Sequence, residues 1–142
     1  MVRFIIALVL LLASIALAII MEGGALLAYA AITAFLLEAL VPFFATLAAW
    51  RLSEIGAAWR DAFSRPVDAA SAARSMRVWA FAERICYATG VLGFLAGGVL
   101  ILGRAGQPGP ELARALGVNL LAPLYSVLFG VFCRIQTARV QQ

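Results

Sequence analysis

The residue in this sequence whose type and position most clearly suggest chemistry is Glu38, the thirteenth of 25 residues in the apolar run 26–50. If that run lies in a membrane, an ionised carboxylate near its middle costs at least ~2.5 kcal/mol. Glu38 must then face protein or water, be protonated, or handle an ion. Pro42, one turn on, frees a backbone carbonyl and bends the helix, so a neutral Glu38 could donate to a carbonyl. A structural, protonated Glu38 and an ion-handling one both stay open.

A second group of polar side chains belongs to two later apolar runs. Asn119 and Ser126 are seven residues apart and share one face of a helix, with Thr89 and Tyr125 expected nearby. Such groups could hydrogen-bond a proton carrier or an ion. They could equally hydrogen-bond between helices, at about 0.6 to 2 kcal/mol each.

The sequence offers no catalytic constellation. It contains no histidine and no nucleophile elbow, and its two cysteines, Cys86 and Cys133, lack the spacing of metal ligands. We expect both thiols to be reduced packing residues near the cytoplasmic ends of their helices. The chain is therefore not expected to be an enzyme or to hold a metal or cofactor.

The elements that must position these residues are membrane helices. Of 142 residues, 65% are hydrophobic and 13% are charged, and the mean hydropathy is +1.02. About 20 apolar residues cross ~30 Å of hydrocarbon. The sequence predicts four spans in one membrane domain, residues 1–142, at about 4–21, 26–50, 85–102 and 111–133. The first run could also be a signal peptide, but it is longer than the usual apolar core of one.

Arginine sets the predicted orientation, because all 11 basic residues are arginines. With a cytoplasmic N-terminus, nine of them lie inside and only Arg104 and Arg114 lie outside, which is a clear positive-inside bias. We expect an all-α, multi-pass protein of a bacterial cytoplasmic (inner) membrane with both termini in the cytoplasm. The same bias and the lipid bilayer account for the net charge of +4, so we expect no nucleic-acid partner.

The segment between the second and third spans, about 51–80, has mixed charge and predicts a short cytoplasmic helical hairpin. Leu52, Ile55, Trp59 and Phe63 recur at helical spacing and predict its buried face. We expect the second helix to continue past the membrane, a break around residues 64–66, and Asp68 as the N-cap of a helix that runs into the third span.

Glycine in the third span indicates a close helix contact. The stretch GVLGFLAGG, residues 90–98, places Gly90, Gly93 and Gly97 at spacings of three and four, and small residues at such spacings let membrane helices approach closely. The nearest partner is the fourth span of the same chain. A second interpretation is that the third helix also lines an interface between subunits.

These features together resemble the MotA/TolQ/ExbB proton-channel family. The matching residues are Glu22-Gly23-Gly24 after the first span, the three glycines of the third span, and the fourth-span stretch LLAPLYS, residues 120–126. The four-span layout resembles the flagellar-stator MotA branch. The resemblance implies a pentameric ring around single-span partner subunits whose membrane aspartate carries protons, with the third and fourth helices lining the pore.

Three departures from the family pattern change what the resemblance implies. Phe94 stands where the family usually has threonine, and Ala122-Pro123 replaces a pair of hydroxyl residues. A phenyl ring cannot replace a hydroxyl that binds a proton or sodium ion. The cytoplasmic segment is also too short to engage a flagellar rotor.

The leading hypothesis from sequence is thus a ring-forming membrane subunit of an ion-driven motor or channel complex. Its helix-packing residues would be Gly90, Gly93, Phe94, Gly97, Ala122 and Pro123, and its ion-handling candidates Glu38, Thr89, Asn119, Tyr125 and Ser126. One alternative is a small proton-coupled transporter, built as a dimer, that uses Glu38. Another is a passive membrane assembly factor.

Overall fold

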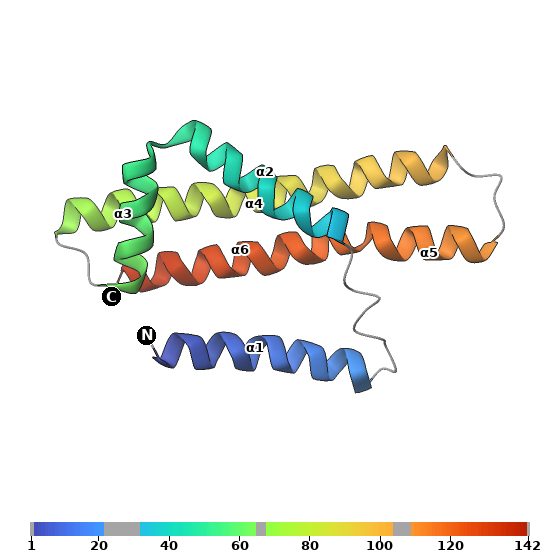
Figure 1. Cartoon of the computed structure of the whole chain (residues 1–142), viewed down its shortest axis with the longest axis horizontal. Coiled ribbons are helices and arrows are strands. Elements are labelled where there is room, and N and C mark those ends of the chain that lie inside the picture. The colour runs from blue at the N-terminus through green and yellow to red at the C-terminus, as the bar shows by residue number, and fades with distance from the viewer. Residues whose placement is uncertain (1, 22–31, 65–67, 104–108, 142) are drawn as a thin grey trace. The chain divides into compact units, whose positions relative to one another are not determined.

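The computed structural model describes residues 2–21, 32–64, 68–103 and 109–141, which form helices and short connections without strands. Figure 1 shows the helices. They are α1 (Val2–Met21), α2 (Ile32–Ala49), α3 (Leu52–Phe63), α4 (Ala69–Leu102), α5 (Gly109–Asn119) and α6 (Leu121–Val140). The all-helical prediction is confirmed for these residues.

The chain divides into two compact units, residues 1–31 and 32–142. The first contains α1, an apolar helix of 20 residues that matches the run predicted at 4–21. The predicted Glu22-Gly23-Gly24 hairpin lies outside the described residues. All the sites discussed below belong to the second unit.

Two helical stretches of the described residues are long and apolar enough to cross a membrane. They are α4, with 34 residues, and the stretch Leu112–Val140 formed by α5 and α6, with 29 residues. The bent pair α2–α3 gives a third if it is counted as one span. The helices are therefore compatible with a membrane protein of two to three spans, while the fourth span and the orientation stay predictions.

Helix α4 extends well beyond the thickness of a membrane. Its N-terminus is capped by Asp68, whose side chain accepts the Ser71 N–H at 2.6 Å, as the sequence predicted. At ~1.5 Å per residue the helix is about 51 Å long, against ~30 Å of hydrocarbon. About 20 Å of α4 can therefore stand outside the bilayer.

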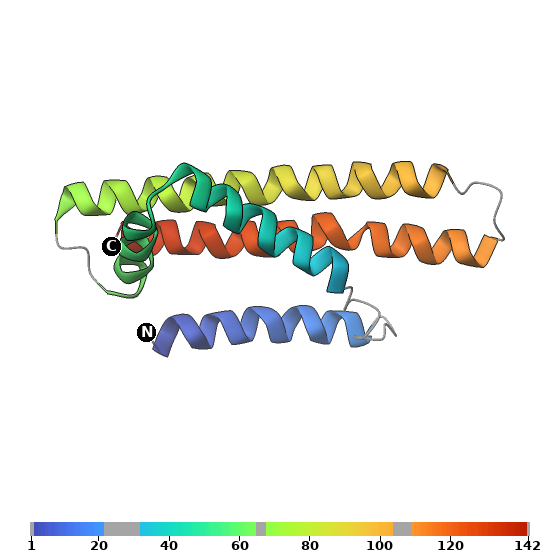
Figure 2. The same cartoon turned by 45° about the horizontal axis from the view of Figure 1, so that its top comes forward.

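The prediction that the second helix continues past the membrane is wrong. The chain turns by 117° between α2 and α3. The backbone of Arg51 is extended, and its N–H donates to the Glu54 carboxylate at 3.1 Å, which caps the start of α3. Helix α3 is therefore a separate helix with its own cap. After the turn it lies across the ends of α4 and α6 (Figures 1 and 2).

The fourth predicted span is interrupted and longer than expected. Pro123 has no N–H to donate to the carbonyl of Asn119, and α5 ends at that residue. Beyond the break α6 continues to Val140 rather than ending near 133. Gln136 and Val140 are 0% and 2% exposed, so this last part of α6 is packed against the rest of the unit.

The buried face of α3 also differs from the prediction. Ala58, Asp61 and Ala62 are buried, whereas Leu52 is 75% and Trp59 is 45% exposed. Because alanine is small, it lets α3 lie close to α4 and α6, and the large residues are displaced to the margin of the contact.

The core of this end of the unit surrounds Trp79 of α4. Its indole N–H donates to the carbonyl of Ala58 at 3.1 Å. Its ring packs edge-on against that of Trp59, with 4.9 Å between the ring centroids. Cys86, Cys133 and Val140 complete the buried cluster. This core fixes α3 to the α4–α6 pair.

Candidate functional site

Helices α4 and α6 lie antiparallel and side by side in both views (Figures 1 and 2). A Cβ added at Gly90 would collide with the Cβ and Oγ of Ser126, and one at Gly97 would lie 2.8 Å from the Asn119 Cγ. We call this contact the glycine seam; it pairs Gly90, Gly93 and Gly97 of α4 with Ser126, Ala122 and Asn119 of α5–α6. The predicted close contact between the third and fourth spans is confirmed.

A further glycine that the sequence analysis missed continues the seam in the opposite sense. A Cβ at Gly130 of α6 would lie 2.6 Å from the ring of Tyr87 on α4. Beyond it, Glu83 and Arg134 form an ion pair with 3.6 Å between their nearest atoms. The glycine, now on α6, makes room for a large side chain of α4.

Glu38 of α2 reaches this seam at the level of Gly93. A Cβ on Gly93 would lie 3.0 Å from the Ala122 Cβ and 3.2 Å from the Glu38 Oε1. Glu38 is 1% exposed, and neither of its carboxyl oxygens has a hydrogen-bond partner among the described residues. The donation from Glu38 to a carbonyl that the sequence left open is therefore absent among the described residues. One turn on, the Thr46 hydroxyl donates to the Pro42 carbonyl at 2.7 Å.

The other polar candidates behave in different ways. Asn119 Nδ2 donates to the Phe94 carbonyl at 3.1 Å, which is an interhelical hydrogen bond of the kind the sequence predicted. Thr89 donates instead to the Ile85 carbonyl one turn back in its own helix, at 2.8 Å. Tyr125 meets the Phe35 ring of α2 edge-on at 5.9 Å. Asn119 and Ser126 thus lie in the seam, and Tyr125 faces α2.

The positions that depart from the family pattern have separate environments. Ala122 is buried opposite Gly93. The Cα of Pro123 lies 3.3 Å from where a Cβ on Gly90 would be, so proline backs the seam. Phe94 contributes its carbonyl to Asn119, while its side chain is 41% exposed.

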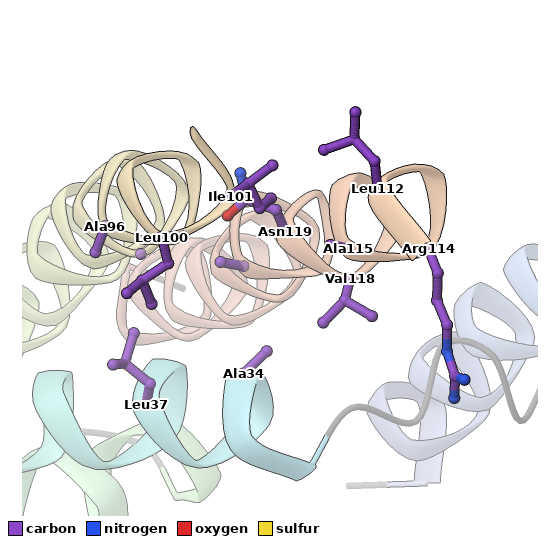
Figure 3. A pocket seen from close by; sticks show the side chains of 13 residues that line it. Ala34, Leu37, Ala96, Leu100, Ile101, Leu112, Arg114, Ala115, Val118 and Asn119 are labelled. Carbon is purple, nitrogen blue, oxygen red and sulfur yellow. The ribbon is translucent and has the colours of Figure 1, made fainter. Parts of the chain in front are cut away.

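A cavity of about 690 Å³ lies between α2, α4 and α5. Figure 3 shows Leu100 of α4 and Leu37 of α2 pointing toward each other across it. Among the described residues that line it, Arg114 is the only charged one. Its inner end is formed by Leu37, Gly93 and Ala122, which are the residues next to the Glu38 carboxyl or the seam. This space could not be predicted from the sequence, because it depends on how three helices diverge.

The two cysteines are neighbours across the α4–α6 pair. Cys86 of α4 and Cys133 of α6 are both buried and belong to the same hydrophobic cluster. From the sequence both are predicted only as packing residues, since the register of two distant helices is not readable from spacing. Within the described residues no group of three or more His, Cys, Asp or Glu side chains could hold a metal ion.

Asp61 of α3 forms a buried polar clasp with α4. Its Oδ2 accepts the hydroxyls of Ser71 at 2.7 Å and Ser75 at 2.8 Å, and Arg60 lies 3.3 Å from its Oδ1. Burial by itself would raise the pKa of Asp61, but the two serine hydrogen bonds, with Arg60, outweigh it and hold the pKa below its usual value. The clasp keeps α3 attached to α4 through an ionised carboxylate.

The fold and the site together define a coarse class: an all-helical protein with apolar helices suited to a membrane, a tight small-residue seam and a buried carboxyl beside it. The chain matches no family model, no curated protein and no solved structure.

Proposed function

We propose that the chain is a ring-forming membrane subunit of a proton-motive-force-driven motor or channel complex of the MotA/TolQ/ExbB type. In this proposal it spans the inner membrane four times with both termini in the cytoplasm. Five copies enclose single-span partner helices, and α4 and α6 face the central axis. The proposal rests on the residue resemblance, and the geometry below supports it.

The observation that carries the proposal is the α4–α6 pair. Helix α4 runs without a break from the glycine seam to the clasp with α3, where Asp61 holds Ser71 and Ser75. A rigid helix pair that projects from the bilayer and carries a clasped cap can transmit a displacement from the membrane to a docked protein. The small size of this cap fits a scaffold better than a flagellar torque generator.

The seam also limits how a ring could form. Gly90, Gly93 and Gly97 are used against α6 of the same chain, so contact between subunits must use other faces of the helices. One such face of α4 carries Val91, Leu95 and Val99, which are 59%, 57% and 69% exposed. Their spacing of four puts them on one side of the helix.

Native mass spectrometry of the full chain, extracted in a mild detergent, tests the ring. We expect a complex of five copies of the 15.1 kDa chain, and added mass when a single-span protein with a membrane aspartate is co-expressed. A purely monomeric or dimeric population in the presence of that partner would contradict the proposal. Replacing Leu95 by Trp on the exposed face should shift the mass to smaller species, while Gly117→Ala, which meets nothing within 4 Å, should leave it unchanged.

A second candidate function is favoured by one observation, the unpartnered burial of Glu38. In this alternative the chain is a small proton-coupled transporter that works as a dimer, and Glu38 takes up and releases the proton. A buried carboxyl without a partner next to a cavity suits such a role.

Proton flux into liposomes separates the two candidates. Glu38→Gln should abolish proton-coupled uptake by the transporter, and Glu54→Gln, outside the predicted spans, is the matched control. Unchanged uptake would remove the transporter. For the ring, Phe94→Thr should increase proton leak through the assembled complex, because it restores a hydroxyl near the pore.

A further inference from the structure

We propose that the cavity between α2, α4 and α5 binds one acyl chain of an anionic phospholipid, whose phosphate pairs with Arg114. This site is independent of whether the chain forms a ring or a transporter. It requires only that these helices lie in a bilayer.

The shape of the cavity points to a lipid tail. Its walls are aliphatic side chains and glycine, apart from Asn119 and Arg114, and the Asn119 amide is already engaged by the Phe94 carbonyl. In Figure 3, Ala34 and Leu37 of α2 point toward α4 and α5 across the space. A volume of about 690 Å³ lies in the range of ligand sites, roughly 300 to 1,000 Å³. The interior thus offers almost no partner for a polar group and favours hydrocarbon.

The charge of the cavity is at one end. Arg114 is in α5 and is the third residue of the candidate span Leu112–Val140, where a long basic side chain reaches the headgroup level of a bilayer. The inner end is at Gly93 and Ala122. From Arg114 to Ala122 is about 12 Å along the helix at ~1.5 Å per residue. A phospholipid that enters from the bilayer therefore keeps its ordinary direction, with its headgroup at Arg114 and its tail pointing inward.

The lining argues for a lipid as the occupant. Among the described residues its one charged side chain, Arg114, lies at one end of a space that is otherwise almost wholly apolar, which matches the charged headgroup and the hydrocarbon tail of an anionic phospholipid. Basic pockets between membrane helices bind anionic lipid headgroups in the same way.

Native mass spectrometry with defined lipids tests the site. The full chain is titrated with phosphatidylglycerol and, separately, with phosphatidylcholine of identical acyl chains. We expect one tightly bound phosphatidylglycerol per chain, retained at least about fivefold better than phosphatidylcholine, because one arginine near a headgroup contributes about that factor. Equal retention of the two lipids would overturn the proposal without the use of any variant.

Two pairs of variants locate the lipid. Arg114→Gln should remove the preference for phosphatidylglycerol, and Arg77→Gln, an exposed arginine outside the cavity, should keep it. Ala34→Leu should weaken retention of the lipid by narrowing the cavity, and Ala48→Leu, exposed on the same helix, should not. Full retention by both Arg114→Gln and Ala34→Leu would overturn the proposal. So would tighter binding of a free fatty acid than of phosphatidylglycerol, or a second copy of the chain occupying the cavity.

Discussion

The substitution Gly90→Ala tests whether the glycine seam holds the helix pair together. The added methyl group would collide with the Cβ and Oγ of Ser126 and would lie 3.3 Å from the Cα of Pro123. The Cβ of Ser126 is fixed to the backbone of α6, so rotating the serine side chain cannot relieve the collision. The two helices must move apart over several residues.

The expected cost follows from this geometry. Overpacking a well-packed contact destabilises by about 1 to 3 kcal/mol, and close van der Waals contact is the main attraction between helices in lipid. Gly117→Ala is the matched control, because a Cβ there meets nothing within 4 Å and the residue lies in α5. We expect the control to change the free energy of unfolding by no more than about 0.5 kcal/mol.

The assay is reversible unfolding of the full chain by titration of SDS into mixed micelles, followed by circular dichroism. A double variant, Gly90→Ala with Ser126→Gly, adds a second readout because it removes the group that the new methyl meets. We expect a coupling free energy of about 1 to 2 kcal/mol between the two positions. Incomplete rescue is expected, since Pro123 stays close. If Gly90→Ala changes the free energy of unfolding no more than Gly117→Ala does, the contact at Gly90 does not hold the helices together. The same follows if the effects of Gly90→Ala and Ser126→Gly are additive.

Three other predictions concern the rest of the second unit. Asp61 has a lowered pKa in the folded state, so its contribution to stability is complete above its unfolded pKa and is lost as pH falls through the folded value. Asp61→Asn should lower the free energy of unfolding by about 1 to 3 kcal/mol at pH 7 and should reduce the fall of that free energy as the pH is lowered. An unchanged fall at acid pH would contradict the clasp. Gly56→Ala meets nothing within 4 Å in a helix outside the predicted spans and should raise the free energy of unfolding by about 0.5 to 1 kcal/mol; destabilisation would mean that α3 is covered there. An apolar oxidant such as iodine should convert Cys86 and Cys133 into an intramolecular disulfide. The disulfide is measured after unfolding as the loss of two thiols that react with maleimide, and Cys86→Ser should prevent it. Disulfides formed only between chains would contradict the helix register.

The sequence predicted the helices better than their mutual arrangement. The spacing of the glycines identified which face of α4 contacts its partner helix, because small residues at spacings of three and four have few other uses in a membrane helix. It could not show that Gly93 meets Glu38 of α2, since register between distant helices leaves no periodic signal. The Cys86–Cys133 contact was missed for the same reason.

The errors at α3 have a different cause. Leu52 and Trp59 were predicted to be buried because hydrophobic periodicity weights large side chains. In the structure the approach of α3 to α4 is set by Ala58 and Ala62, which are small enough to allow it. The turn before α3 depends on a cap by Glu54 on the backbone of Arg51, a weak signal without the usual Ser, Thr, Asp or Asn at the cap.

Glu38 offers the sharpest distinction between a structural and a functional role. A buried polar group without a partner costs about 1 to 3 kcal/mol, and both carboxyl oxygens of Glu38 lack one among the described residues. If the carboxyl has no partner in the membrane either, Glu38→Met, which keeps similar length and is apolar, should raise the free energy of unfolding by an amount in that range.

The two roles predict different combinations of stability and proton flux for Glu38→Met. If Glu38 handles protons, Glu38→Met gains stability and loses proton flux in liposomes, which is the signature of a residue kept for activity at the expense of the fold. If Glu38 is structural, the same variant loses stability, because the carboxyl then makes a contact in the membrane that the methionine cannot replace. A gain in stability with unchanged flux would contradict both roles and leave the carboxyl without a use in this chain.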